Sequence, residues 1–213
     1  MSLHASHPRT IAHDGRYELE IKRSRFVCTV ARVASEDEAR AALDQRRREF
    51  PDANHHCFAY VIGDRGERQK SSDDGEPAGT AGVPILEAIR RHGVVDTLAV
   101  VARFFGGTKL GTGGLIRAYG SAVSGAIESV GIVERRPLDV VTIRVAYHEA
   151  GRVERALRGS SHPPAAIEYG VDVRFAVNLA PEEVPAFRAR LADISAGAIR
   201  AEVSGRTVDE VPV

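Results

Sequence analysis

The spacing of apolar and polar residues in the first half of the chain predicts three strands. Leu19 and Ile21 alternate with charged neighbours, and an apolar stretch follows directly, so we expect residues 17–32 to be extended. Residues 57–62 and 97–105 are apolar runs of strand length. A continuous apolar run of this length is typical of a buried strand.

Helix signals separate these strands. Ser35 opens a capping-box pattern, and Pro84 in a first turn with Gly93 as a stop bounds a second helix. Apolar residues at spacings of three and four run through residues 115–130 and predict a third helix. Residues 63–82 contain hardly any apolar side chain, so we expect a long polar loop there, of a length that is often functional.

The second half changes rhythm near residues 135–137 and predicts the order β-α-β-β-α-β, which is that of a ferredoxin-like fold. Its strongest strand signal is strict alternation of apolar residues. The predicted elements are residues 141–147, 152–158, 165–169, 171–179, 181–197 with Gly197 as the stop, and 199–203. We therefore divide the chain into an N-terminal tail (1–16), a first domain (17–136) and a second domain (137–213).

Composition describes a globular protein without a dominant charge. Lys and Arg together number 29, as do Asp and Glu, so the net charge is zero. This balance excludes a protein that binds polyanions over its whole surface. No apolar run approaches the roughly 20 residues of a membrane span. The two cysteines, Cys28 and Cys57, lie in apolar segments, as expected for reduced thiols in the cytoplasm.

Three polar segments carry candidate chemistry, and the first surrounds Lys22. If residues 17–32 form one strand, Lys22 and Ser24 share one face while Arg23 and Arg25 share the other. These cations could keep an exposed strand from pairing with another chain, or they could contact an anion. Both interpretations stay open, and Lys22 and Arg25 are candidate anion-binding residues.

The second segment is the polar stretch that begins near Lys70. Three carboxylates within four positions could hold a hard cation, but the spacing of an EF-hand is absent, so no calcium site is expected. Capping of turns by the acidic side chains and Mg²⁺ shared with a phosphate ligand are the remaining interpretations. The acidic loop consists of Asp73, Asp74 and Glu76, and Lys70 and Ser72 are candidate anion contacts.

The third segment follows the predicted strand at 97–105 and opens the helix at 115–130. Because it is rich in glycine, its backbone N–H groups can converge at the positive end of that helix and form an anion nest. It matches neither the Walker A nor the Rossmann fingerprint. Close packing of strand against helix is the alternative reason for the glycines. The candidate anion-binding residues here are Arg103, Gly106, Gly107, Lys109, Gly111, Thr112, Gly113 and Gly114.

The chain matches no catalytic or metal-binding motif. His55 and Cys57 could converge on one face of a strand, but no second Cys/His pair has zinc spacing. There is no nucleophile elbow and no zinc-protease motif, and no nucleophile–base pair is visible. We therefore expect no metal and no cofactor, and a binding protein rather than an enzyme.

In their order along the chain, these segments resemble the IMPACT/YigZ family. The resemblance extends over roughly residues 20–125, and the second half resembles the C-terminal domain of bacterial members mainly by pattern. The motifs that carry it are Ser24-Arg25-Phe26, Pro51-Asp52-Ala53-Asn54-His55-His56-Cys57, Ser72-Asp73-Asp74-Gly75-Glu76-Pro77-Ala78-Gly79-Thr80-Ala81-Gly82, Arg103-Phe104-Phe105-Gly106-Gly107 and Leu110-Gly111-Thr112-Gly113-Gly114-Leu115-Ile116-Arg117-Ala118-Tyr119-Gly120.

The resemblance implies an α+β fold in which the first domain is a two-layer α/β sandwich. That sandwich would be like domain IV of elongation factor G and the second domain of a small-subunit ribosomal protein. The second domain would be ferredoxin-like, as the pattern independently predicts. Eukaryotic IMPACT proteins regulate translation by restraining activation of an eIF2α kinase. Many members have tyrosines where this chain has Phe104 and Phe105, so a hydroxyl role is not expected there.

Three hypotheses for the function follow. The first and preferred one is a non-catalytic cytoplasmic regulator linked to translation, which binds RNA, the ribosome or a ribosome-associated protein through its first domain. The second is a phosphate-ligand-binding protein or enzyme that uses the Gly-rich loop and the acidic loop. The third is an adaptor that binds protein through an exposed apolar face of the second domain's sheet. The sequence does not determine the oligomeric state.

Overall fold

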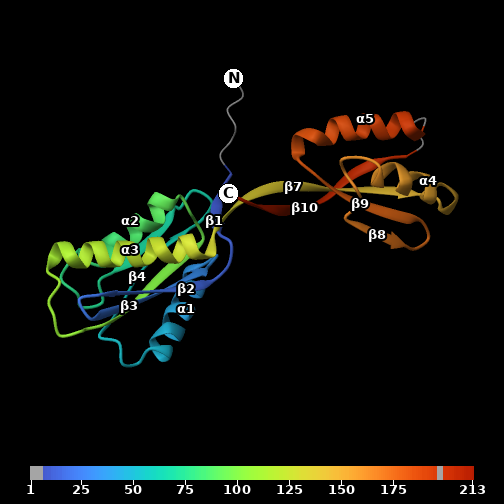
Figure 1. Cartoon of the computed structure of the whole chain (residues 1–213). Helices are drawn as coiled ribbons and strands as arrows, with labels where there is room; N and C mark the ends of the chain where they lie inside the picture. The colour runs from blue at the N-terminus through green and yellow to red at the C-terminus, as the bar shows by residue number, and fades with distance from the viewer. Residues whose placement is uncertain (1–6, 196–198) are drawn as a thin grey trace, which may run out of the picture. The chain divides into compact units, whose positions relative to one another are not determined.

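A computed structural model describes residues 7–195 and 199–213 and divides the chain into two compact units (Figure 1). The N-terminal unit holds the residues up to 135 together with 211–213, and the C-terminal unit holds residues 136–210. Both units combine helices with strands, so the predicted α+β class is confirmed. No helix in the described part of the chain is long and apolar enough to cross a lipid bilayer.

A five-stranded antiparallel sheet forms the centre of the N-terminal unit. In spatial order its strands are β2 (Gly15–Ile21), β3 (Ser24–Arg32), β6 (Thr97–Phe104), β4 (His55–Ile62) and β5 (Arg68–Ser72). The central strand, β6, pairs with β3 and β4. Because the pairing is antiparallel, the loop that follows β6 leaves the sheet between the starts of its two neighbours.

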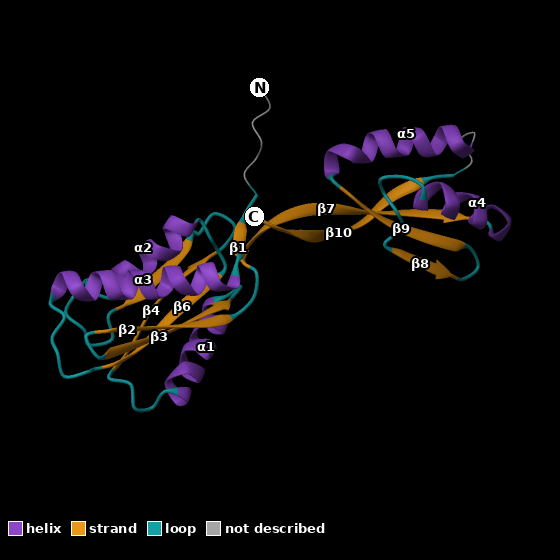
Figure 2. Cartoon of the chain, viewed as in Figure 1, coloured by secondary structure: helices purple, strands orange, loops and turns teal. Residues whose placement is uncertain are grey.

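Helices lie on both faces of this sheet. α2 (Gly82–His92) and α3 (Thr112–Val130) cover one face and form the main core with the strands (Figure 2). α1 (Glu36–Glu49) packs on the opposite face through Ala39 and Leu43. The sandwich that the family resemblance implies is thus present, and α1 adds a partial layer behind it.

Alternation of side chains along β6 explains its continuous apolar sequence. Val101 belongs to the core beneath α2 and α3, whereas Val100 belongs to the cluster on the α1 face. Arg103 lies on the same face as Val101, since its guanidinium lies over the ring of the core residue Phe26. Phe104 lies on the α1 face, as Val100 does, and packs against Phe50, which follows α1. Neighbouring residues of one sequence motif therefore serve opposite faces of the sheet.

Residues 17–32 form two strands, and the prediction of a single strand was wrong. A two-residue turn at Lys22 and Arg23 joins β2 to β3, with φ angles of 49° and 65°. Positive φ at both central residues is the type I′ geometry that hairpins prefer. Neither Gly nor Asn marks the turn in the sequence, so the usual signal is absent. The assignment of Lys22 and Ser24 to one strand face is corrected with it.

The predicted polar loop at 63–82 contains a strand, β5. It pairs with β4 over its whole length, from Arg68 opposite Ile62 to Ser72 opposite Phe58. Its sequence, Arg-Gln-Lys-Ser-Ser, has no apolar position because β5 is an edge strand with largely exposed side chains. Hydrophobic periodicity could not reveal such a strand.

The predicted N-terminal tail also contains a strand. β1 (Arg9–Ile11) pairs with the first residues of β7 (Ile132–Val145), and Thr10 and Ile11 are buried. Ile11 belongs to the main core of the N-terminal unit. A three-residue strand is too short to show periodicity, so the assignment of residues 9–11 to a tail is corrected.

The C-terminal unit has the predicted order β-α-β-β-α-β. Its elements are β7, α4 (Tyr147–Arg158), β8 (Ala166–Tyr169), β9 (Val173–Leu179), a short 3-10 turn at Pro181–Glu183, α5 (Val184–Ser195) and β10 (Ala201–Pro212). β7 pairs with β9 and β10, and β8 pairs with β9. β10 extends beyond the predicted end at residue 203. The prediction ended too early because the later residues of the strand are mostly polar and carry little hydrophobic signal. The predicted stop at Gly197 lies outside the described residues.

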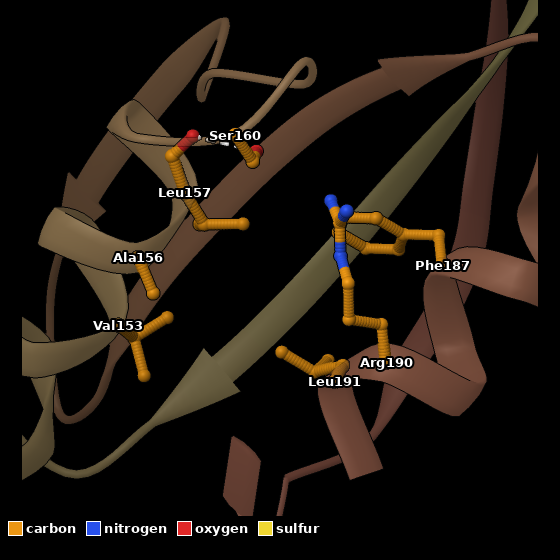
Figure 3. A pocket seen from close by; sticks show the side chains of 7 residues that line it. All are labelled: Val153, Ala156, Leu157, Ser160, Phe187, Arg190 and Leu191. Carbon is orange, nitrogen blue, oxygen red and sulfur yellow. Dashed lines mark hydrogen bonds between the residues drawn. The ribbon is translucent and has the colours of Figure 1, made fainter. Parts of the chain in front are cut away.

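Only one face of the C-terminal sheet contributes to a core. β9 alternates buried residues such as Phe175 with exposed ones such as Arg174, as the period-two pattern predicts. The hollow between α4 and α5 has a volume of about 20 Å³, which is enough for a single water molecule (Figure 3). The other face carries charged residues, among them Arg144, Glu168 and Glu202, so the apolar face that the adaptor hypothesis needs is absent from the described sheet.

Gly106 passes directly over the β2–β3 turn, and this close approach can be tested. A Cβ atom at Gly106 would lie 2.0 Å from the carbonyl carbon and oxygen of Arg23. We expect Gly106→Ala to lower the free energy of unfolding by about 1–3 kcal/mol, measured by urea denaturation followed by circular dichroism. Gly113→Ala is the matched control, because its Cβ would meet only the tip of Arg117, at 3.5 Å. A Gly106→Ala variant as stable as the wild type would contradict the geometry.

Candidate functional site

The predicted anion-binding residues lie on two faces of the N-terminal sheet. Lys70 and Ser72 line a groove of about 480 Å³ between β5 and α1. The guanidinium of Arg25 stacks on Phe104, 4.3 Å from the ring centroid, and Lys22 lies in the hairpin turn. None of these four side chains lines the pocket on the other face, so the structure does not bring the whole predicted set together.

A second group of predicted residues does converge, on an open pocket of about 510 Å³ at the end of β6. This volume lies within the range of roughly 300–1,000 Å³ that is typical of small-molecule sites. The walls come from the start of β4, the acidic loop after β5, the end of β6 and the start of α3. The lining residues are Asn54, His55, Glu76, Pro77, Arg103, Phe105, Lys109, Leu110, Gly111, Thr112 and Leu115.

A buried ion pair forms the floor of this pocket. Arg103 Nη1 donates to Glu76 Oε1 over 2.5 Å, and only 7% and 3% of the two side chains are exposed. The guanidinium carbon of Arg103 lies close to two aromatic rings, 5.5 Å from the centroid of Phe26 and 5.6 Å from that of Phe105. Arg103 Nε is buried and has no partner among the described residues. Because an unsatisfied buried donor is costly, the fold satisfies this ion pair only in part.

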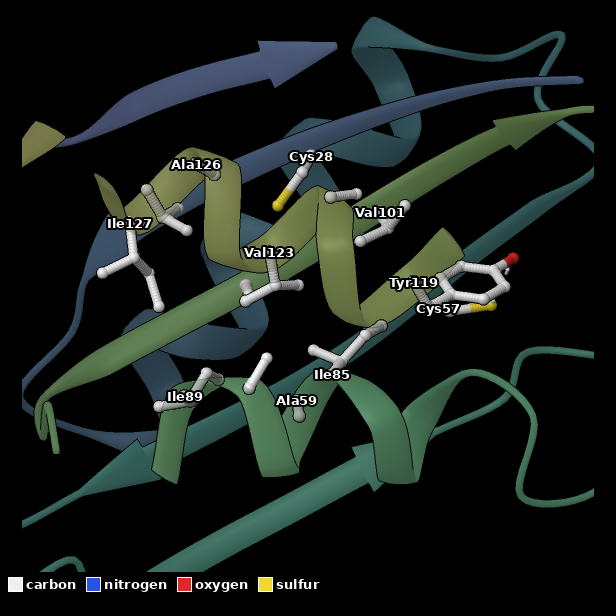
Figure 4. Packing of buried hydrophobic residues seen from close by; sticks show 14 of the residues in the cluster. Cys28, Cys57, Ala59, Ile85, Ile89, Val101, Tyr119, Val123, Ala126 and Ile127 are labelled. Carbon is white, nitrogen blue, oxygen red and sulfur yellow. Dashed lines mark hydrogen bonds between the residues drawn. The ribbon is translucent and has the colours of Figure 1, made fainter. Parts of the chain in front are cut away.

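Tyr119 fixes the position of Glu76. Its hydroxyl donates to Glu76 Oε1 over 2.7 Å, and its ring packs edge-on against Phe26 at 5.2 Å. Figure 4 shows Tyr119 on α3 beside Cys57 of β4. Burial raises the pKa of Tyr119, and the neighbouring Cys57 and Glu76 raise it further, so the hydroxyl stays protonated and keeps donating. The sequence pattern assigned Tyr119 only to the apolar stripe of α3; a tyrosine inside such a stripe is the signal that could have indicated a buried polar partner.

Cys57 is a structural thiol in this arrangement. Its Sγ donates to the carbonyl oxygen of Asp73 over 3.0 Å and contacts the Tyr119 hydroxyl at 3.3 Å. Burial raises the pKa of the Cys57 thiol to about 12. Since the thiolate is the nucleophilic form, Cys57 is not an activated nucleophile.

The three carboxylates of the acidic loop bind three different sets of partners. Asp73 accepts from backbone N–H groups at the start of α2, Asp74 accepts from the N–H of His56 and pairs with Arg47, and Glu76 enters the pocket. The described residues contain no cluster of three His, Cys, Asp or Glu side chains that could hold a metal ion. The grouping of these carboxylates as one site is therefore corrected, and only Glu76 lines the pocket.

His55 and Asn54 shape the rim next to Glu76. His55 Nδ1 donates to the carbonyl oxygen of Asp74 over 2.8 Å, because a carbonyl oxygen can only accept. The side-chain oxygen of Asn54 accepts from the N–H of Phe105 over 2.8 Å. This bond fixes the first residue of the loop between β6 and α3.

The start of α3 supplies the positive end of a 19-residue helix to the same pocket. Gly111 is the N-cap residue, with a φ of 73°, and no side chain caps the first turn of the helix. The backbone N–H groups of that first turn therefore lack intrahelical partners. Gly111 and Thr112 line the pocket, whereas Gly113 and Gly114 do not. With Lys109 on the rim, the helix dipole adds to a positive charge that Glu76 only partly offsets.

The two glycines that precede Lys109 do not line the pocket. The N–H of Gly106 donates to the buried Ser24 hydroxyl over 3.2 Å, beside the β2–β3 turn. Gly107 has a φ of 82°, which favours glycine. Of the two interpretations of these glycines, close packing holds for Gly106, and only the start of α3 has the geometry that an anion nest requires.

Comparison with known proteins places this site in a family. The chain matches the Impact N-terminal domain over residues 22–127 and a domain of unknown function, DUF1949, over residues 143–198. IMPACT family member YvyE from Bacillus subtilis (strain 168) is 40% identical over 188 residues, which are 88% of this chain and 87% of the relative. This chain belongs to the IMPACT family.

Two further relatives cover most of this IMPACT family chain. IMPACT family member YigZ from Escherichia coli (strain K12) is 39% identical over 183 residues, 85% of this chain and 90% of the relative. A solved structure described as the crystal structure of an hypothetical protein is 36% identical, with a TM-score of 0.61, and covers 94% of this chain and 98% of its own. All pocket residues, from Asn54 to Leu115, fall within the matched Impact domain.

Asp73 organises the acidic loop, and its role has a pH signature. Burial alone would raise the pKa of Asp73, but N–H groups of Gly79, Gly82 and Ala81 donate to the carboxylate and hold the pKa below its usual value. A lowered pKa in the folded state stabilises the protein above the unfolded-state pKa of about 3.9, and this contribution disappears as the pH falls through the folded-state pKa.

We therefore expect Asp73→Asn to lower the free energy of unfolding by about 1–3 kcal/mol at pH 7. The difference from the wild type should shrink in urea titrations carried out at progressively lower pH below about 4. Asp64→Asn, at an exposed position, is the matched control and should leave stability unchanged at every pH. A constant difference down to pH 2 would show that the charge of Asp73 is not what organises the loop.

Proposed function

We propose that this IMPACT family chain is a non-catalytic, translation-linked factor that binds RNA through the β6–α3 end of its N-terminal unit. The observation that carries the proposal is the positive pocket at the start of α3, with Arg103 in its floor and Lys109 on its rim. The chain has no net charge, so RNA affinity must come from a local group of cations.

The β2–β3 turn extends this positive surface. Gly106 packs against the backbone of Arg23, which brings Lys22 and Arg23 next to the β6–α3 loop. Both residues are exposed and have positive φ, a conformation that costs about 1 kcal/mol in residues with a Cβ atom. An Asn-Gly pair would form the same turn without this cost. Two cations in its place support a role in contacting phosphate groups.

An exposed aromatic residue adjoins the cations. Phe105 keeps 49% of its surface exposed at the mouth of the pocket. Exposed aromatic rings next to cations are typical of surfaces that bind single-stranded nucleic acid, because bases stack on the rings while the cations follow the backbone. The resemblance to IMPACT proteins, which implies a fold like domain IV of elongation factor G, supports the link to translation. We therefore place the proposed activity in the cytoplasm, on the ribosome, RNA or a ribosome-associated protein.

The lysines allow a charge-specific test. We expect the double variant Lys22→Gln/Lys109→Gln to bind a single-stranded RNA oligonucleotide at least tenfold more weakly at 50 mM salt, with a slope of log affinity against log salt that is shallower by about 1.4. Fluorescence anisotropy across a salt series measures both quantities. Lys70→Gln, on the opposite face of the sheet, is the matched control and should bind as the wild type does. Equal affinity of all three proteins would refute the proposed surface.

A small phosphorylated ligand is the second candidate function, because the pocket volume and the buried Arg103 also fit a free nucleotide. In that case nucleoside mono-, di- or triphosphates, with or without Mg²⁺, should raise the melting temperature of the wild type by several degrees. Lys109→Gln should reduce this shift. A melting temperature that no nucleotide changes would exclude this function.

A further inference from the structure

We propose that the pocket holds one unpaired nucleotide of single-stranded RNA. Its base edge would lie against Glu76 and Arg103, its ring against Phe105, and its phosphate at the start of α3 near Lys109. This inference rests on the proposed RNA-binding function and specifies which form of RNA the site accepts.

The floor of the pocket presents an acceptor and a donor side by side. Both hydrogen bonds to Glu76 are to Oε1, so among the described residues nothing donates to Oε2. Arg103 uses Nη1 for the ion pair, and its Nε has no partner within the described residues. A carboxylate oxygen beside a guanidinium N–H complements a nucleobase edge, on which a ring or amino N–H donor stands next to an acceptor.

Burial makes this floor a built site and not a surface coincidence. More than nine-tenths of each of the two charged side chains is withdrawn from solvent. Tyr119, a third buried polar group, holds Glu76 in place. Among the described residues Glu76 Oε2 receives no hydrogen bond, and it is not one of the fully buried unpaired atoms. A base edge that donates to Oε2 and accepts from the guanidinium of Arg103 would complete the hydrogen bonding of the pair.

The walls match the rest of a nucleotide. Phe105 at the mouth offers a face for stacking, and Leu110 and Leu115 add apolar surface. The first turn of α3 and Lys109 provide backbone N–H groups and a cation for the phosphate. The pocket thus offers one contact region for each of the three parts of a nucleotide.

An unpaired base is required by the depth of the contacts. In a duplex the Watson–Crick edge is occupied and both ring faces are stacked, so neither the floor nor Phe105 can be reached. Single strands, loops and ends present bases that can enter a pocket. The site is therefore expected to discriminate strongly against double-stranded RNA.

Exposed residues provide the cleanest test, because Glu76→Gln would leave buried Arg103 without its counter-charge and risks the fold. Fluorescence anisotropy of the full chain with a ten-nucleotide oligouridine should give an affinity about tenfold or more above that for a duplex RNA of equal length. Phe105→Ala should weaken oligouridine binding about tenfold and leave duplex binding unchanged. Tyr169→Ala, which removes an exposed ring in the C-terminal unit, is the matched control and should change neither affinity.

The outcomes separate this inference from the proposed function. Equal affinity for both RNAs, or an unaltered Phe105→Ala variant, would overturn the nucleotide pocket while RNA binding itself stands. Failure to bind any RNA at 50 mM salt would overturn both. Uridine 5′-monophosphate serves as a third probe. Competition between this mononucleotide and oligouridine for the wild-type protein supports the inference. If the mononucleotide binds but no RNA does, the ligand of the pocket is a free nucleotide and the inference is overturned.

Discussion

The buried pair of Glu76 and Arg103 is the interaction on which the N-terminal unit's site depends. It joins the loop after β5 to the end of the central strand, and Tyr119 ties both to α3. Breaking a buried ion pair by removing one partner costs about 3–5 kcal/mol, because the other charge is left unpaired. The same pair is only partly satisfied, since Arg103 Nε has no partner in the described part of the chain. The interactions that stabilise this unit and the proposed binding site thus reside in one cluster.

Side chains that bind backbone groups hold the pocket walls in place. Asp73 fixes the acidic loop to the start of α2, Asn54 fixes the start of the β6–α3 loop, and Ser24 ties Gly106 to the hairpin. Each bond satisfies N–H groups that would otherwise lack a partner. The walls are therefore set before any ligand arrives, which lowers the entropy cost of binding.

Sequence pattern predicted the elements with strong periodicity and missed those without it. Alternation in residues 171–179 correctly indicated a half-buried strand, whereas β5 and β1 carry too little apolar signal to be found. The site was predicted in part: Arg103 and Lys109 reach the pocket, but Lys70 lies on the other face of the sheet. Adjacent residues of β6 point to opposite faces of the sheet. The direction of the Glu76 side chain depends on its hydrogen bond with Tyr119, which is 43 residues away in the sequence. Neither fact is visible locally.

The central claim is that Arg103 is held in the pocket with an N–H group ready for a ligand. Nuclear magnetic resonance of the arginine Nε–H signals tests this claim most directly, because a buried Nε–H group exchanges slowly with water and gives an observable signal. The signal that disappears in an Arg103→Lys variant is assigned to Arg103. On titration with oligouridine we predict that the Arg103 Nε–H signal shifts and saturates together with the backbone amides of residues 112–114. An Arg103 signal that stays unchanged while the RNA is bound would contradict the account.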